Sequence, residues 1–338
     1  MSVLQGLQDR AAARPAHIVL SEGHDPRVVA GAVSAVRAGF SRITLVGQTE
    51  DLLGQLAAVG AAIGPQIAIE DPHTSALTNE FAQTYFDLRK HKGVSEDIAA
   101  IQARDPLVFA AMMVRNGHAD GTVGGAVATT SDTVRAALQI IGKAKDAPLV
   151  SSFFLMALPE GHPSGRSAMI FGDCGLVIDP NSEELAAIAV ASAASCKQLL
   201  GDAPKVALLS FSTKGSARHP AVTKVSDAVE ILQRDHPNPP SDGELQFDAA
   251  FVPAVAATKA PGSAIEGRAN VMIFPNLDAG NIGYKIAQRI GGATAIGPVL
   301  QGLAKPANDL SRGCNAQDVF NMIAVTIVQV QALRQRPG

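Results

Sequence analysis

Short runs of β-forming residues alternate with longer helix-forming segments from one end of the chain to the other. The helix-forming segments carry apolar residues three or four positions apart, as in residues 26–40, 131–142, 182–201 and 277–291. This alternation predicts an α/β fold in which mostly parallel sheets are covered by helices on both faces. The strand-like runs are residues 17–20, 42–47, 121–125, 151–158, 167–173, 205–211, 270–274 and 294–300.

The length of the chain predicts two lobes. It has 338 residues, and a single hydrophobic core stops growing at roughly 250 to 300 residues. With 47% hydrophobic and 17% charged residues, the chain has enough apolar material for two cores. We expect residues 1–146 and 298–338 to form the first lobe, which includes the C-terminal helix. Residues 147–297 should form the second, and each lobe should be a three-layer α/β/α arrangement.

Turns rich in glycine, serine and charged residues follow five of the predicted strands. Because ligands of open α/β sheets bind beyond the carboxyl ends of the strands, these turns predict a shared active-site cleft, which we expect between the lobes. Residues 236–246, rich in proline, aspartate and glycine, are by contrast typical of a surface loop. The five turns are residues 21–27, 124–130, 172–182, 210–217 and the stretch that begins at Leu303.

Composition excludes several classes of partner. The chain has 28 basic and 31 acidic residues without runs of like charge, so it lacks the pattern of nucleic-acid binding or of a polybasic membrane patch. No apolar run reaches the ~18 residues of a membrane span, and the N-terminal segment does not read as a signal peptide. Three widely spaced cysteines, Cys174, Cys196 and Cys314, argue against a disulfide framework or a zinc site and fit a reducing cytoplasm. We therefore expect a cytoplasmic protein with small-molecule substrates.

Common motifs for nucleotide, metal and hydrolase sites are missing from the sequence. It contains no GxGxxG after a strand, no GxxxxGK[ST], no HExxH and no GxSxG. These exclusions leave acyl or phosphoryl transfer without an evident metal or redox cofactor.

The segment LSRGCNAQD, residues 310–318, combines a helix start with a set of reactive groups. Asn315 is a good N-cap, and Asp318 is three residues further on, at the capping-box position. On spacing alone, a structural capping role is the more common outcome for this aspartate. A capping box prefers the longer Glu or Gln, however, so an Asp leaves room for a second role as a base.

Three neighbours favour that second role. Gly313 precedes a helix N-terminus, which is a natural place for an anion, and Arg312 and Lys305 could act as its charge partners. Ser311 adds a hydroxyl of the kind that stabilises a developing oxyanion. A base, a hydroxyl and a guanidinium within eight residues exceed what a helix cap needs.

The stretch GPVLQGLAKPANDLSRGC, residues 297–314, followed by Asp318, resembles the C-terminal signature of the phosphate acetyltransferase (phosphotransacetylase) group of the phosphate acetyl/butyryltransferase family. The resemblance implies reversible conversion of acetyl-CoA and phosphate to CoA and acetyl phosphate, as in acetate metabolism. It also implies CoA as co-substrate, no tightly bound cofactor, no metal, and a homodimer. Six further blocks resemble the family in the same order: residues 85–93, 124–142, 171–185, 208–217, 247–263 and 269–289.

The resemblance also implies roles for individual residues. Asp318 matches the family's base, Ser311 its oxyanion-side hydroxyl and Arg312 its phosphate-contacting arginine. Arg89 and Arg135 match two further arginines of the acyl-phosphate site. Lys259, Lys285 and Arg289 match positions that offer cations to CoA.

Alternatives remain open at this stage. Arg89 and Arg135 could be ordinary surface ion-pair partners. Cys314, at a helix start beside Arg312, could have a lowered pKa and form an acyl-enzyme, although we favour direct attack by the CoA thiolate with Asp318 as base. Other possible functions are a phosphate butyryl- or propionyltransferase, a metal-dependent decarboxylating dehydrogenase of similar fold, and a non-catalytic acyl-CoA-sensing module.

Overall fold

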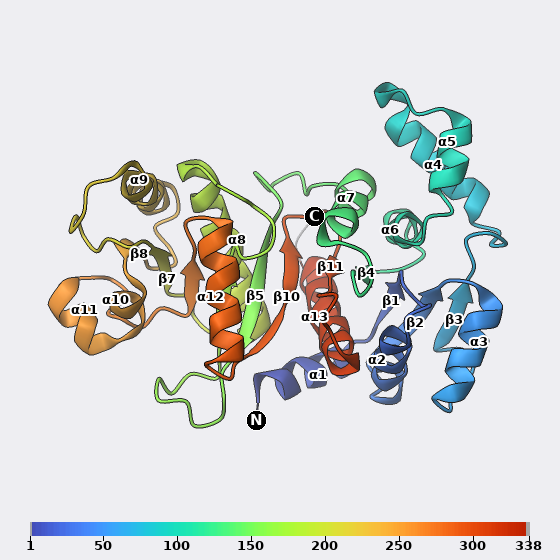
Figure 1. Ribbon diagram of the computed structural model, residues 1–338, viewed down its shortest axis with the longest axis horizontal. Coiled ribbons are helices and arrows are strands. Elements are labelled where there is room, and N and C mark those ends of the chain that lie inside the picture. Colours follow the sequence, from blue (N-terminus) through green and yellow to red (C-terminus); the bar gives the residue numbers. More distant parts are fainter. Residues whose placement is uncertain (1, 336–338) are drawn as a thin grey trace. The chain divides into compact units, whose positions relative to one another are not determined.

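The computed structural model describes residues 2–335 and divides into two compact units, each with its own sheet (Figure 1). Within the described residues, the terminal unit comprises Leu4–Lys145 and Leu303–Gln335, and the central unit comprises Ser2–Val3 and Asp146–Gly302. The boundary expected at 297/298 falls inside β10 (Thr294–Gln301), which pairs with β5 (Ser151–Ala157) of the central sheet, and residues 298–302 lie in the central unit.

The terminal unit is built on a sheet whose neighbouring strands are all parallel, in the order β11-β4-β1-β2-β3 within the described residues. In such a sheet all strands end at one edge, where the turns that follow them meet. Asp309 at the end of β11 is in register with Gly124 at the end of β4, so these two turns leave the sheet side by side. The strands are β1 (Ala16–Leu20), β2 (Ser41–Val46), β3 (Ile67–Glu70), β4 (Gly121–Gly124) and β11 (Ala307–Asp309).

Helices cover both faces of the terminal sheet, with α2 and α13 on one side and α6 and α7 on the other (Figure 1). The pair α2 and α13 comes so close at Gly31 that a Cβ there would lie 2.6 Å from the Cβ of Val319. The helices are α1 (Val3–Ala13), α2 (Pro26–Arg37), α3 (Thr49–Ala58), α4 (Thr78–Arg89), η1 (Lys90–Lys92), α5 (Glu96–Gln102), α6 (Pro106–Asn116), α7 (Thr130–Ile140) and α13 (Ala316–Gln335).

The central unit has a mixed sheet, in the order β10-β5-β6-β9-β7-β8 within the described residues. Strand β5 pairs antiparallel with both β10 and β6, and the remaining pairings are parallel. Its further elements are β6 (Ala168–Gly172), α8 (Ser182–Leu200), β7 (Val206–Leu209), α9 (Pro220–Asp235), β8 (Ser241–Leu245), α10 (Phe247–Phe251), α11 (Pro253–Lys259), β9 (Val271–Ile273) and α12 (Leu277–Arg289).

The surface loop expected at residues 236–246 is found at residues 236–240, which are mostly exposed and lie outside helices and strands, but residues 241–245 form strand β8. Its residues are buried although their sequence, SDGEL, is polar. The charged side chains are compensated by partners on the β7–α9 segment, because Asp242 pairs with Lys214 and Glu244 accepts hydrogen bonds from the Ser212 hydroxyl (2.9 Å) and the Gly215 amide (2.7 Å). Burial of polar residues is acceptable where each finds such a partner.

The predicted α/β fold class, with two mostly parallel sheets flanked by helices, is confirmed. Each of the eight predicted strand regions contains a strand, whereas β3, β8 and β11 were not predicted. Among the described helices, none has the length and apolar character required to cross a membrane.

Candidate active site

The residues that start α13 form the capping box expected from their spacing. Asn315 Oδ1 accepts hydrogen bonds from the backbone amides of Gln317 (2.8 Å) and Asp318 (3.0 Å), and Asp318 Oδ2 accepts one from the amide of Asn315 (2.9 Å). In residues 2–335, no hydrogen bond to the second carboxylate oxygen, Oδ1, is found. The cap therefore holds Asp318 in place and leaves one oxygen available to a ligand.

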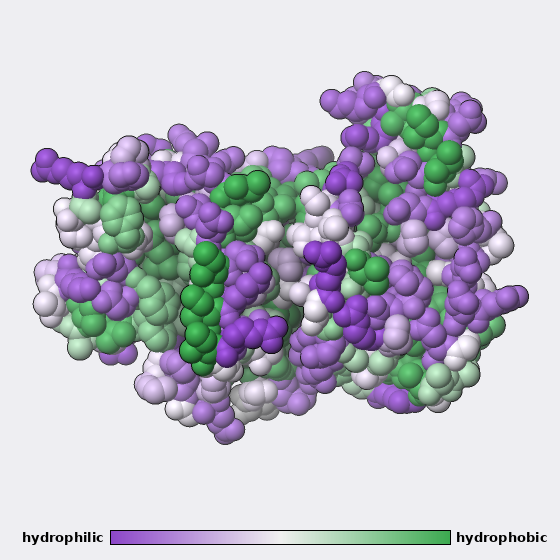
Figure 2. All heavy atoms as spheres, viewed as in Figure 1, coloured by the Kyte–Doolittle hydropathy of each residue, from purple (hydrophilic) through white to green (hydrophobic). Residues whose placement is uncertain are grey.

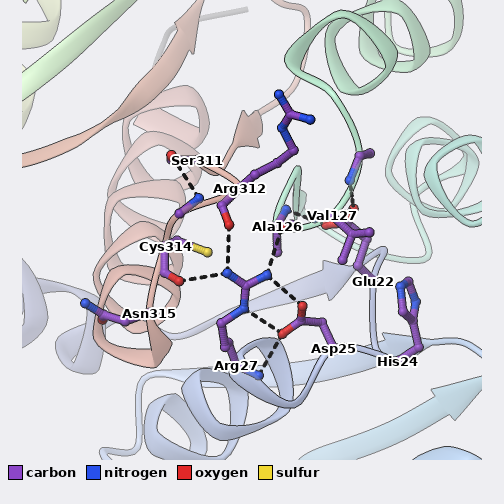
Figure 3. A network of polar contacts seen from close by, with 12 residues as sticks. Glu22, His24, Asp25, Arg27, Ala126, Val127, Ser311, Arg312, Cys314 and Asn315 are labelled. Carbon is purple, nitrogen blue, oxygen red and sulfur yellow. Dashed lines mark hydrogen bonds and ion pairs between the residues drawn. The ribbon is translucent and has the colours of Figure 1, made fainter.

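Ser311 and Arg312 lie in the loop between β11 and α13, and both are exposed. The Ser311 Oγ accepts a hydrogen bond from the Gly313 amide (3.2 Å), so its own proton can be donated elsewhere. The Arg312 guanidinium makes no ion pair within the described chain, and Figure 3 shows it extending away from the polar network below it. Lys305, expected as a charge partner, instead donates to the carbonyl oxygens of Val114 (2.7 Å) and Arg115 (3.3 Å) at the end of α6.

Below this loop lies a residue that sequence reasoning missed, Arg27. Its Nη1 donates to the carbonyl oxygens of Arg312 (2.8 Å) and Cys314 (2.9 Å), and its Nη2 donates to that of Ala126 (2.8 Å). Asp25 accepts from Nε (3.0 Å) and Nη2 (2.7 Å) (Figure 3). Hydrogen bonding between the two side chains lowers the pKa of Asp25 and raises that of Arg27, so this ion pair stays charged near neutral pH.

Glu22, also missed, holds the turn between β4 and α7. Only 3% of Glu22 is exposed, and its carboxylate accepts the backbone amides of Ala126 (2.6 Å), Val127 (3.1 Å) and Ala128 (2.6 Å). Several amide donors on one buried carboxylate satisfy its charge without a cation. The turn that leads into α7 is thereby fixed by a side chain from the turn after β1.

Asp309 is a second buried carboxylate at this sheet edge. It is fully buried, and neither of its oxygens has a well-oriented hydrogen-bond partner in the described chain. Burial raises the pKa of Asp309 to about 7, and the charge of Glu22 adds to the rise, while the nearby hydroxyls of Thr130 and Thr133 act in the opposite direction. Gly125, at φ +92°, lies so close that a Cβ there would be 1.9 Å from Asp309 Oδ1, which explains the glycine.

An acyl-enzyme route needs a cysteine thiol with a lowered pKa, and the surroundings of Cys314 shift its pKa in the opposite direction. The side chain is buried, and burial raises the pKa of its thiol, an effect that Arg27 only partly opposes. The lowered pKa considered for this cysteine is therefore not found, because removal from water outweighs the neighbouring guanidinium.

The two other arginines expected at the acyl-phosphate site also belong to the terminal unit. Arg135 lies on α7, whose N-cap is Thr129, and forms an exposed ion pair with Asp132 (2.8 Å). Arg89 ends α4, is partly buried, and has a buried Nε without a hydrogen-bond partner in the described residues. The register of β4 with β11 places the start of α7 beside the Ser311 loop, whereas no hydrogen bond or ion pair among the described residues links Arg89 to that loop.

The three cations expected for CoA lie in the central unit. Lys259, at the end of α11, donates to Asp248 (2.8 Å) and Gln246 (3.1 Å). Lys285 and Arg289 are exposed and one turn apart on α12, with the Lys285 ammonium 5.7 Å from the centre of the Tyr284 ring. The helix thus brings two of these cations together, while Lys259 stands on a separate element.

The sequence contains only a weak signal for the site residues that were not predicted. Glu22, Asp25 and Arg27 belong to SEGHDPR, one of the five turns rich in glycine, serine and charge. That composition places them at the carboxyl end of a strand. Their partners are about 100 residues away for Glu22 and 285 or more for two of the Arg27 bonds, so local sequence could not reveal them.

Comparison with known proteins shows the family to which the chain belongs. A sequence profile described as "Phosphate acetyl/butaryl transferase" matches residues 2–327. A phosphate acetyltransferase from Paracoccus denitrificans is 50% identical over 331 residues, which span 98% of this chain and 100% of the relative. One from Thermoanaerobacterium thermosaccharolyticum is 46% identical with the same coverage. The crystal structure of a phosphotransacetylase from Streptococcus pyogenes matches with a TM-score of 0.90 at 42% identity, and 98% of each chain is covered.

The fold, the loop after β11 and these matches define an enzyme of the acyltransferase class. Within that class, the chain belongs to the phosphate acetyl/butyryl transferase family, so the resemblance carried by the C-terminal signature and the six blocks is confirmed.

Proposed function

We propose that the protein catalyses the reversible conversion of acetyl-CoA and inorganic phosphate to CoA and acetyl phosphate. The observation that carries the proposal is the segment 311–318, which carries a hydroxyl, a guanidinium without an ion pair and a carboxylate with one unbonded oxygen within eight residues of the described chain. The names of full-length relatives at 50% and 46% identity support acetyl as the acyl group.

Asp318 is the proposed base. A thiol has a pKa near 8.5 in water, so the CoA thiol is mostly protonated at neutral pH, and a positioned carboxylate that takes the proton accelerates attack by roughly 10²- to 10⁴-fold. The free Oδ1 of Asp318 would accept that proton while Oδ2 keeps the cap. As the S–H bond breaks, a C–S bond forms at the carbonyl carbon of acetyl phosphate.

Ser311 and the arginines stabilise the charges that this attack creates. The carbonyl oxygen becomes an oxyanion, and the Ser311 O–H is the proposed donor to it. When the tetrahedral intermediate collapses, the C–O bond to phosphate breaks and inorganic phosphate leaves. Arg312, Arg89 and Arg135 are proposed to neutralise the phosphate, since a guanidinium binds phosphate oxygens with two parallel N–H bonds.

For CoA, the proposed contacts are the cations of the central unit. Lys259, Lys285 and Arg289 would attract the phosphate groups of the nucleotide end. Lys259 would have to exchange its partners Asp248 and Gln246 for the ligand. Lys285 and Arg289 need no such exchange, because neither is engaged by an acidic side chain in the described residues.

The proposal includes a homodimer. Helix α12 exposes Ile282 (58%), Ile286 (52%) and its C-cap residue Ile290 (84%), each four residues apart, and they form a narrow apolar column on the face shown in Figure 2. Contiguous exposed apolar residues are typical of an interface. The three isoleucines are uncharged, so the column suits the same helix of a second copy across a two-fold axis, with the exposed Lys285 and Arg289 of α12 on its flank.

One assay tests the proposed reaction. Purified protein is mixed with acetyl phosphate and CoA, and formation of the thioester is followed by its ultraviolet absorbance. Propionyl and butyryl phosphate in place of acetyl phosphate test the alternative acyl groups. Thioester formed only from the longer acyl phosphates would replace acetyl in the proposal, and no thioester from any of them would favour a non-catalytic acyl-CoA-sensing module.

A further inference from the structure

The Arg27 guanidinium joins three segments that are far apart in the sequence. It begins in the first turn of α2 and reaches carbonyl oxygens of the loop before α13 and of the turn before α7 (Figure 3). Its Nε and the remaining donor of Nη2 bind Asp25, which orients the guanidinium plane. The outward-facing N–H groups are thereby directed at backbone rather than at solvent.

The carbonyls that Arg27 binds frame the proposed catalytic groups. Those of Arg312 and Cys314 lie on either side of Gly313, between Ser311 and the first turn of α13. The carbonyl of Ala126 belongs to the turn whose amides bind Glu22, so that turn is held on both its N–H and its C=O side. A shift of the guanidinium would therefore move the Ser311 loop relative to a turn that is otherwise fixed.

Only a guanidinium fits this position. Arginine offers five N–H groups in a rigid planar fork, whereas lysine has three donors on a single nitrogen atom at the end of a flexible chain. A lysine at residue 27 could keep the ion pair with Asp25 or reach one carbonyl, but it could not reach the carbonyls of Arg312 and Ala126 together in the same plane.

We propose that Arg27 is a positioning residue for acyl transfer, which holds Ser311, the Arg312 backbone and the start of the Asp318 helix in register with the β4–α7 turn. The inference rests on the proposed function, because it assigns Arg27 a role in that reaction. A misplacement of about 1 Å in a reacting group can lower a rate by about 10²-fold. Loss of the hydrogen bonds that Arg27 makes to these carbonyls should therefore appear mainly as a lower kcat.

The test compares Arg27→Lys and Arg27→Ala with Arg37→Ala. Arg37 is a matched control, because it lies on the same helix and its guanidinium also binds two backbone carbonyls, those of Val59 (2.9 Å) and Gly60 (3.0 Å), away from the loop 311–318. Steady-state kcat and KM for both substrates and the melting temperature are measured for each variant. We expect kcat to fall by about 10²-fold in both Arg27 variants, with small changes in KM, and to stay near wild type in Arg37→Ala.

Chemical rescue separates positioning from general loss of structure. Methylguanidinium added at millimolar concentration should restore part of kcat in Arg27→Ala by refilling the space of the lost group, and should not affect Arg37→Ala. If Arg27→Ala does not fold, Arg27→Lys carries the test through its kcat. Wild-type kcat in either soluble Arg27 variant, or a raised KM for acetyl phosphate with unchanged kcat, would overturn the inference. An inactive wild-type protein would instead contradict the proposed function.

Discussion

At the residue scale, the geometry of Asp318 is compatible with two roles, the helix cap that it forms and the base that we propose. One oxygen closes the capping box and the other is free, so a carboxylate proposed as a base is held in place by helix structure. The proposed second role would account for an aspartate at a position where a capping box alone favours glutamate.

The variant Asp318→Asn tests the base. The amide oxygen of asparagine can still accept the Asn315 N–H, so we expect the melting temperature to change little, while kcat falls by about 10²- to 10⁴-fold because an amide cannot take the thiol proton. Asn315→Ala is the complementary variant. It should cost roughly 1 kcal/mol of unfolding free energy, measured by denaturant titration, with a smaller loss of kcat. Equal losses of kcat in both variants would assign Asp318 to the cap alone.

Asp309 predicts a pH dependence of stability. Its pKa in the folded protein is about 7, above the value of about 3.9 expected in the unfolded chain. Between these two values the folded state holds a proton that the unfolded state has lost, so the free energy of unfolding contributed by Asp309 decreases as the pH rises through this window and levels off above about pH 7.

The variant Asp309→Asn should remove the contribution of Asp309 to the pH dependence of the unfolding free energy. Denaturant titrations at about pH 5 and about pH 8 should show a drop in stability that is smaller in the variant than in the wild type by about 2 to 3 kcal/mol. Asp97→Asn, an exposed aspartate of α5, is the control and should leave the wild-type dependence unchanged. A drop of the same size in Asp309→Asn and wild type would show that Asp309 is not the titrating group.

At the element scale, the position of α13 depends on its close approach to α2. Gly31→Ala places a methyl group 2.6 Å from the Val319 Cβ and 2.8 Å from the Ala316 carbonyl oxygen, so the helices must separate. We expect a loss of about 1 to 3 kcal/mol in unfolding free energy, and a lower kcat because α13 carries Asp318. Denaturant titration measures the loss of unfolding free energy, and the thioester assay measures kcat.

Gly54→Ala is the control for that substitution. Gly54 lies inside α3, and nothing lies within 4 Å of the Cβ that the change would add. Alanine is the better helix former, so this variant should gain up to about 1 kcal/mol and keep wild-type activity. If Gly31→Ala were as stable as Gly54→Ala, the close contact between α2 and α13 would not be what requires glycine at residue 31.

The elements also show how far local sequence could lead. The sequence pattern predicts eight strand regions, and the spacing of Asn315 and Asp318 predicts the start of α13. Both predictions succeed because they depend only on residues that are neighbours in the sequence. Strand β8 was missed because its polar side chains are satisfied by partners on another segment. The Arg27 network was missed for the same reason, since its acceptors lie up to 287 residues away. Strand β8 and the Arg27 hydrogen bonds both depend on residues that are distant in the sequence, and no local pattern reveals such partners.

At the scale of the whole molecule, the isoleucine column on α12 predicts an assembly. Wild-type protein should have the mass of a dimer in sedimentation equilibrium, and Ile286→Glu should have that of a monomer, because the new charge would be buried without a partner. Ile98→Glu, at another exposed isoleucine, should remain dimeric. A monomeric wild type, or a dimeric Ile286→Glu variant, would contradict the proposed interface.

The division of the terminal unit between the two ends of the chain has a consequence for biosynthesis. The sheet that supports the candidate site takes β1 to β4 from the first 145 residues, but β11 and α13 follow the entire central unit. A chain emerging from the ribosome therefore displays Arg27 long before the loop that it binds, residues 311–318, exists. The candidate site is assembled last, so we expect chains interrupted after the central unit but before β11 to carry the central fold without acyltransferase activity.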